Sequence, residues 1–136
     1  MSLCWLDGRR RIATLRRQPD SVRALNGAAL KALSDNDLDR AGSLLREASE
    51  LEPLDYELHN NLGIVYIRQG KPEEGLCELL KAVRLKPDLA SAHFNLGRLY
   101  QSPGIGNRAL SEHHLRIALE LGYPVPDEFR PANQTY

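Results

Sequence analysis

The sequence is poor in the features that mark several classes of protein. Its 136 residues include only two cysteines, Cys4 and Cys77, which lie far apart and have no CxxC spacing. A disulfide framework is therefore not indicated, and we expect two reduced thiols. No window approaches the ~18 consecutive apolar residues of a membrane-spanning helix. The apolar run at the start is too short for a secretory signal, and its charges follow the run instead of preceding it.

The chain also lacks net charge, because 18 Lys and Arg balance 18 Asp and Glu. This balance removes the bulk argument for a nucleic-acid or anionic-membrane partner. The hydrophobic fraction of 42% and the charged fraction of 26% are close to those of soluble globular domains, which argues against a disordered or fibrous chain. We therefore expect one folded domain, located in the cytoplasm.

Signatures of catalysis and of metal binding are absent as well. There is no GxxxxGK[ST] or GxGxxG loop, and Glu112-His113-His114 lacks the HExxH spacing that would place two histidines on one helix face. The sequence therefore predicts no catalytic residue, no metal and no cofactor. We expect a protein that is not an enzyme and has no small-molecule substrate.

What the sequence does contain is an internal repeat. The segment HNNLGIVY at 59–66 recurs 34 residues later as HFNLGRLY at 93–100. The segment from Ala82 recurs 36 residues later from Ala118, which implies a two-residue insertion. Apolar residues within each copy follow helical spacing, and clusters of Gly, Pro, Asn, Asp and Ser divide each copy in two. No stretch alternates with the period of a strand, so the repeat predicts successive pairs of helices.

These motifs resemble the tetratricopeptide repeat family, whose unit of ~34 residues reads W-x2-L-G-x2-Y, then A-x3-F, then P. The first motif falls on His59, Leu62, Gly63 and Tyr66, and again on His93, Leu96, Gly97 and Tyr100. The resemblance implies an all-α fold, a right-handed superhelical stack of antiparallel helix pairs (an α-solenoid) of three units plus an N-terminal helix. It also places His59 and His93 at the bulky packing position, as buried groups and not as ligands or bases.

We predict three units with a flanking segment at each end. The units span 22–55, 56–89 and 90–125, of which the first is degenerate and the last carries the insertion. Residues 1–21 form a basic N-terminal helix, as a half-repeat or cap, and 126–136 form a tail.

Prolines after the third unit exclude a long capping helix there. The outer face of the last hairpin is then left bare, unless Val125 and Phe129 fold back over it or a partner chain covers it. This leaves self-association through uncapped ends, and so a homo-oligomer, as one open hypothesis.

The resemblance implies that function lies on the concave surface made by the first helix of each pair. We expect eight side chains to bind a peptide there: Asn26, Asn60, Asn61, Ile64, Arg68, Phe94, Asn95 and Arg98. Asn61 and Asn95 are interpreted as rungs of a ladder, because an amide offers a donor and an acceptor to an extended peptide backbone. The alternative is that asparagine is simply common at this place in such repeats. The arginines favour an acidic ligand, with Ile64 and Phe94 as apolar contacts.

One family variant is not supported. Members that bind the C-terminal carboxylate of a chaperone use two lysines, two asparagines and an arginine on the concave face. Of those places only Asn61 matches, and the others hold Asn26, Leu30, Ser91 and Asn95. Three cationic places are vacant, so little remains to pair with a terminal carboxylate.

The main prediction is therefore a non-catalytic scaffold for a protein or peptide partner, alone or as a module of a larger protein. A further hypothesis concerns the N-terminal arm, since residues 1–23 hold six arginines and only two aspartates. Arg9–Arg17 could meet phosphate on nucleic acid or on a lipid surface. Such a run is more often a solvated helix face, so we do not expect nucleic acid or membrane as the main partner.

Overall fold

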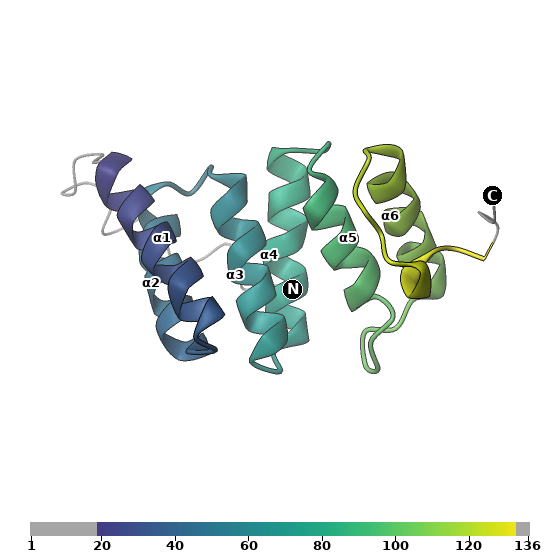
Figure 1. Cartoon of the computed structure of the whole chain (residues 1–136), viewed down its shortest axis with the longest axis horizontal. Coiled ribbons are helices and arrows are strands. Elements are labelled where there is room, and N and C mark those ends of the chain that lie inside the picture. Colours follow the sequence, from purple (N-terminus) through teal and green to yellow (C-terminus); the bar gives the residue numbers. More distant parts are fainter. Residues whose placement is uncertain (1–18, 133–136) are drawn as a thin grey trace.

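The computed structural model describes residues 19–132 as a stack of helix pairs, with no strand in this part of the chain. The elements are α1 (Pro19–Ser34), α2 (Leu38–Leu51), α3 (Tyr56–Arg68), α4 (Pro72–Leu85), α5 (Ala90–Leu99), α6 (Arg108–Glu120) and the short 3-10 helix η2 (Asp127–Phe129). Helices α1 and α2, α3 and α4, and α5 and α6 pack as consecutive pairs, which stack along the long axis of the molecule (Figure 1). The predicted all-α stack is confirmed. The predicted N-terminal helix lies outside the described residues, except for the few that begin α1.

Short polar side chains set where the helices begin. The backbone N–H of Arg40 donates to Asp37 Oδ1 at 3.2 Å at the start of α2, and that of Leu110 donates to Asn107 Oδ1 at 3.1 Å at the start of α6. Each cap satisfies a backbone donor that has no partner within the helix. Helix α1 begins at Pro19, ahead of the predicted unit boundary at 22, because proline is well suited to the first position of a helix.

Equivalent leucines form the centre of each pair. Leu45, Leu79 and Leu115 are almost fully buried, with 0%, 0% and 1% of their surface exposed. Small residues on the first helix make room for the last two of these leucines. A Cβ atom added at Gly63 would lie 2.8 Å from Leu79 Cγ, and one at Gly97 would lie 2.5 Å from Leu115 Cγ.

The two histidines of the repeat motif are buried, as the sequence predicted. His59 Nε2 lies 2.7 Å from the Pro53 carbonyl oxygen, and His93 Nε2 lies 2.7 Å from that of Pro87. A carbonyl oxygen can only accept a hydrogen bond, so the ring N–H is the donor in both cases. Each histidine thus ties the first helix of its pair to the turn that precedes it.

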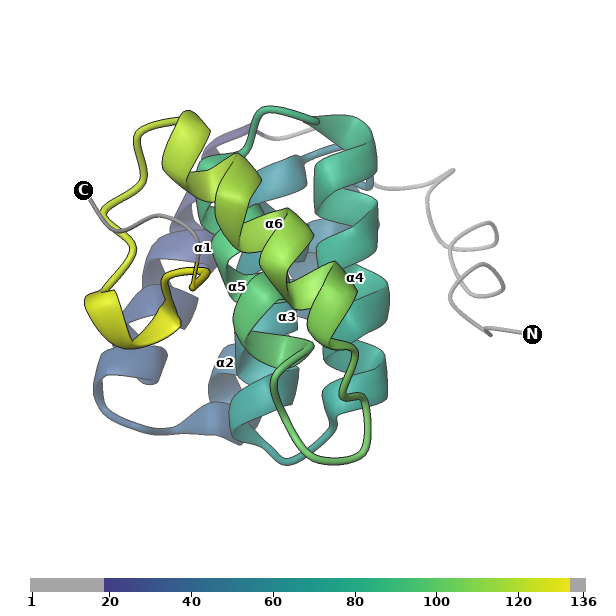
Figure 2. The same ribbon diagram turned by 90° about the vertical axis from the view of Figure 1, so that its right-hand side faces the viewer.

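The C-terminal segment folds back over the last hairpin. After α6 the chain returns alongside that helix (Figure 2), and Val125 is only 2% exposed. The Phe94 ring stacks on Tyr123 with centroids 4.8 Å apart and meets Phe129 edge-on at 5.8 Å. Of the alternatives that the sequence left open for this face, the structure shows the one in which the tail covers it.

The cysteine prediction needs a correction. Cys77, on α4, is disulfide-bonded, so the predicted reduced thiol is wrong for this residue, while Cys4 lies outside the described residues. Sequence spacing could not show this, because a disulfide depends on two Cα atoms lying within about 7 Å in the folded chain.

No helix within 19–132 combines the length and the apolar character needed to cross a bilayer.

Candidate interaction surface

The first helices of the three pairs stand side by side and form one face of the molecule. Helices α1, α3 and α5 lie in front of α2 and α4 in the view of Figure 1, and we call the surface that they share the first-helix face. Three side chains, each 34 residues from the next, make a row across it. Leu30 is 46% exposed, Ile64 is half-buried and Arg98 is exposed.

The asparagines predicted to hold a peptide are bonded to one another. Asn61 Nδ2 donates to Asn26 Oδ1 at 3.2 Å, and Asn95 Nδ2 donates to Asn60 Oδ1 at 3.1 Å. Asn60 also donates to Ser91 Oγ at 3.4 Å and is only 8% exposed. The same contact therefore recurs between successive repeats. These amides join neighbouring first helices, a role that spacing along the sequence did not indicate.

Arg68 also connects two repeats. Its guanidinium donates to Asn36 Oδ1 at 2.8 Å and to the Leu33 carbonyl oxygen at 3.3 Å. The adjacent Gln69 donates to the Leu38 carbonyl oxygen at 3.2 Å. The end of α3 is thereby fastened to the turn between α1 and α2. Arg68 remains exposed but spends at least two of its donors inside the molecule.

The expectation that Phe94 provides an apolar contact is corrected by its burial. Its exposure is only 7%, because Tyr123 and Phe129 cover the ring. Arg98 lies over the same group, with its guanidinium carbon 5.6 Å from the Phe94 centroid and 5.3 Å from that of Phe129. Phe94 therefore belongs to the core of the last hairpin, and Arg98 marks the place where the first-helix face meets the tail.

Of the eight predicted residues, two are buried and the others lie on or near the first-helix face. The accessible or half-buried ones are Asn26, Asn61, Ile64, Arg68, Asn95 and Arg98. Leu30 completes this surface although the sequence prediction did not include it among the binding residues. Its place 34 residues before Ile64 was the signal that could have identified it.

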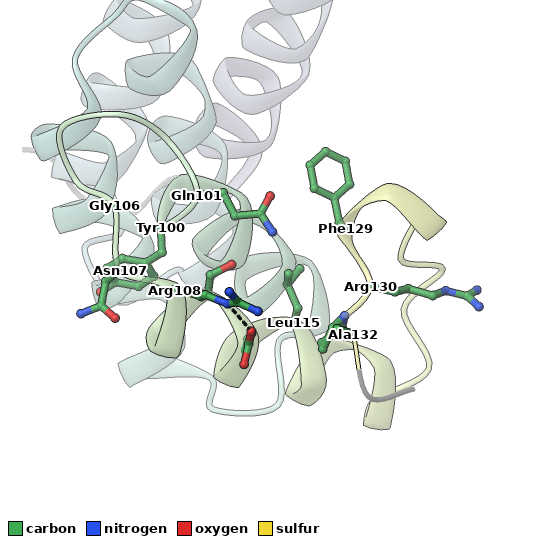
Figure 3. A pocket seen from close by; sticks show the side chains of 12 residues that line it. Tyr100, Gln101, Gly106, Asn107, Arg108, Leu115, Phe129, Arg130 and Ala132 are labelled. Carbon is green, nitrogen blue, oxygen red and sulfur yellow. Dashed lines mark hydrogen bonds and ion pairs between the residues drawn. The ribbon is translucent and has the colours of Figure 1, made fainter. Parts of the chain in front are cut away.

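A hollow of about 540 Å³ opens at the C-terminal end of the stack. Gln101 from the end of α5 and Arg108 from the start of α6 line it, with Phe129 and Arg130 of the tail across from them (Figure 3). Its polar groups bond within the chain, since Arg108 pairs with Glu112 at 2.8 Å and Arg130 Nε donates to the Val125 carbonyl oxygen at 3.2 Å. The sequence could not predict this hollow, because it exists only when the tail folds back.

Within residues 19–132 no group of three or more His, Cys, Asp or Glu is placed to hold a metal ion.

Two family models match the chain. Residues 65–104 match a model described as TPR repeat, and residues 44–76 match one described as tetratricopeptide repeat. Among curated proteins, DnaJ homolog subfamily C member 3 of Gallus gallus is 30% identical over 102 residues, which are 75% of this chain and 20% of the relative. The protein of the same name from Homo sapiens is 28% identical over equal shares. The chain thus spans about a fifth of the length of the curated relatives it matches.

Solved structures show the same fold at low identity. The first TPR domain of Spaghetti (RPAP3), bound to the HSP90 peptide SRMEEVD, gives a TM-score of 0.74 at 18% identity over 82% of this chain and 86% of that one. The translocator chaperone SycD of Yersinia enterocolitica gives 0.71 at 16% identity, with 80% of each chain covered. The MamA R50E mutant gives 0.67 at 23% identity over 78% of this chain and 76% of that one.

Proposed function

Since this chain is built of tetratricopeptide repeats, we propose that it is a non-catalytic scaffold that binds a protein segment on its first-helix face. The observation that carries the proposal is the row formed by Leu30, Ile64 and Arg98. A leucine that is 46% exposed, beside a half-buried isoleucine, gives a partner apolar surface to cover. The exposed guanidinium of Arg98 at the end of the row favours an acidic side chain in that partner.

The paired asparagines are compatible with this role. An amide has two N–H donors and an oxygen with two lone pairs, and the Asn61 to Asn26 bond uses one donor and one lone pair. The remaining donors and acceptors can meet a peptide backbone. Because the bond between repeats already holds both side chains, less conformational entropy is lost when a partner binds.

The RPAP3 domain, of similar fold, was solved with an HSP90 peptide, which supports peptide binding as the general mode. We do not extend that ligand to this chain. Leu30 and Ser91 stand at two of the places where chaperone-carboxylate binders carry polar or cationic groups, and a leucine cannot pair with a carboxylate. We propose instead a segment with apolar and acidic side chains.

The test compares two leucines of similar exposure on different helices. Leu30→Glu places a charge on the first-helix face, and Leu80→Glu places one on α4, where the leucine is 38% exposed. Proteins captured from the source cell by the wild-type chain would be quantified by mass spectrometry with both variants. We expect the captured partner to fall at least tenfold, equivalent to about 1.4 kcal/mol, with Leu30→Glu and to persist with Leu80→Glu.

Circular dichroism would establish that both variants keep their helical content. A partner that persists with Leu30→Glu and disappears with Leu80→Glu would move the binding surface to α4 and contradict the proposal.

The compartment is likewise a proposal. Sequence composition favours the cytoplasm, whereas a disulfide at Cys77 favours an oxidising compartment. Alkylation of the intact source cell followed by peptide mass analysis would decide between them, because a cytoplasmic chain is expected to carry an alkylated Cys77.

A further inference from the structure

The buried histidines of the second and third hairpins face different partners. In the second hairpin His59 Nδ1 lies 2.7 Å from Glu78 Oε2, whose other oxygen accepts from Lys81 at 3.0 Å. In the third hairpin His93 Nδ1 lies 3.0 Å from Nδ1 of His114. His114 follows Glu78 by 36 residues, the repeat spacing that includes the insertion. A histidine thus stands where the preceding repeat has a carboxylate.

The two arrangements respond to protons in opposite ways. Burial alone would lower the pKa of His59, but its hydrogen bonds to Glu78 and Pro53 outweigh burial and raise the pKa above 6.5. At His114 burial acts first and the charges of His93 and His113 act in the same direction, so its pKa falls to about 4.

Hydrogen bonding explains why the third hairpin tolerates protons poorly. His93 Nε2 donates to the Pro87 carbonyl oxygen, so in the neutral ring Nδ1 is an acceptor and His114 Nδ1–H is its donor. When both rings are protonated, both Nδ1 atoms are donors and the bond is lost. Two like charges then face each other at the 3.0 Å contact.

No compensating carboxylate lies around this pair among the described residues. The rings near His114 are Tyr100, at 5.7 Å, and His113, at 5.2 Å. Burial raises the pKa of Tyr100, so that it stays neutral in acid. The side of α4 that packs against α5 is apolar: Leu76, Leu79 and Val83. Glu78 and Lys81 on α4 act on His59 instead.

We propose that the His93–His114 pair is an acid-sensitive joint, through which protonation loosens α5 from α6 while the second hairpin stays closed. Because α5 carries Asn95 and Arg98, acid would dismantle the third repeat's share of the first-helix face. The joint is a property of the fold and does not depend on the proposed function.

The direction follows from linkage between protonation and folding. A histidine whose pKa is lower in the folded state stabilises the fold above pH 6.5 and loses that contribution as the pH falls from 6.5 toward about 4. His59, whose pKa is raised, contributes most below pH 6.5 and loses its contribution as the pH rises through its folded pKa. Acid therefore strengthens the second hairpin and weakens the third.

Amide hydrogen exchange measured by NMR at pH 7 and pH 5 tests the joint. For the wild-type chain we expect protection factors in α5 and α6 to fall on the order of tenfold, with those of α3 and α4 unchanged or higher. His114→Glu copies the second hairpin and should abolish the fall. Glu78→His copies the third and should transfer the fall to α3 and α4.

His113→Gln is the matched control, since it removes a neighbouring charge but keeps the hydrogen-bonded pair, and it should retain most of the fall. Equal protection of α5 and α6 at both pH values in the wild-type chain would overturn the proposal. So would an undiminished fall in folded His114→Glu. If that variant does not fold, the wild-type gradient and the response of Glu78→His still decide the outcome.

Discussion

Phe94 stands where the two preceding repeats have an asparagine. Asn26 and Asn60 each accept a hydrogen bond from the next repeat, whereas Phe94 meets Tyr123 and Phe129 of the tail. An aromatic ring cannot continue the series of amide contacts, and it offers apolar area that the tail covers. A single residue type thus separates an internal repeat from the last one.

At this scale we predict that Phe129→Ala destabilises the fold. The half-buried ring covers Phe94 and lies under Arg98, so its removal should lower the free energy of unfolding by about 1–3 kcal/mol, less than for a fully buried phenylalanine. Urea unfolding followed by circular dichroism measures the difference. Glu128→Ala, at an exposed neighbouring position, should change the value by less than about 0.5 kcal/mol. Equal effects of the two substitutions would show that the tail does not cap the stack.

At the scale of the element, the helix pairs depend on close approach at one position. Gly63 faces Leu79 and Gly75, and a Cβ atom there would lie 3.2 Å from the Gly75 carbonyl oxygen as well as against the leucine. The backbone cannot move away as a flexible side chain can. The glycine of the repeat motif is therefore a packing requirement of the two helices.

We accordingly predict that Gly63→Ala lowers the free energy of unfolding by about 1–3 kcal/mol, the usual cost of overpacking. Gly27→Ala is the control, because nothing lies within 4 Å of a Cβ atom there. Alanine restricts the unfolded chain and favours helix, so Gly27→Ala should stabilise by about 0.5–1 kcal/mol. Thermal unfolding of both variants gives the two signs, and a stabilising Gly63→Ala would contradict the packing argument.

Helix ends were largely predictable from local chemistry. Asp37 and Asn107 cap helices with their own side chains, and Pro72 is the first residue of α4. These contacts join residues at most a few positions apart, which is why the sequence indicates them. The return of the tail joins Phe129 to Phe94, 35 residues away, and the sequence left it as one of several alternatives.

For the molecule as a whole, each hairpin contacts its neighbours in the stack, so stability is close to a sum of hairpin and interface contributions. Arg68 and Gln69 add polar contacts between the first two hairpins. The matching positions of the third repeat hold Ser102 and Pro103, which cannot make the same bonds. The coupling between hairpins is therefore uneven along the chain.

We predict that Arg68→Ala weakens the first hairpin selectively. Loss of the bonds to Asn36 and Leu33 should cost about 0.5–1 kcal/mol at this exposed site and lower protection from hydrogen exchange in α1 and α2 by about twofold to fivefold. Arg116→Ala, exposed on α6, should leave α1 and α2 unchanged. A uniform loss of protection over all helices would indicate that the hairpins unfold as one unit and not as neighbours in a series.

The sequence by itself determined the repeat, the helix pairs, the packing glycines and the buried histidines, because each follows from periodicity and from contacts that recur at every 34th residue. The tertiary structure decided what each surface-facing polar residue does. It pairs the asparagines across repeats, sets His93 against His114 and buries Phe94 under the tail. These contacts depend on how successive helices are turned toward one another. A repeat spacing gives the position of a residue on its own helix but not which side chain of the next helix lies opposite it.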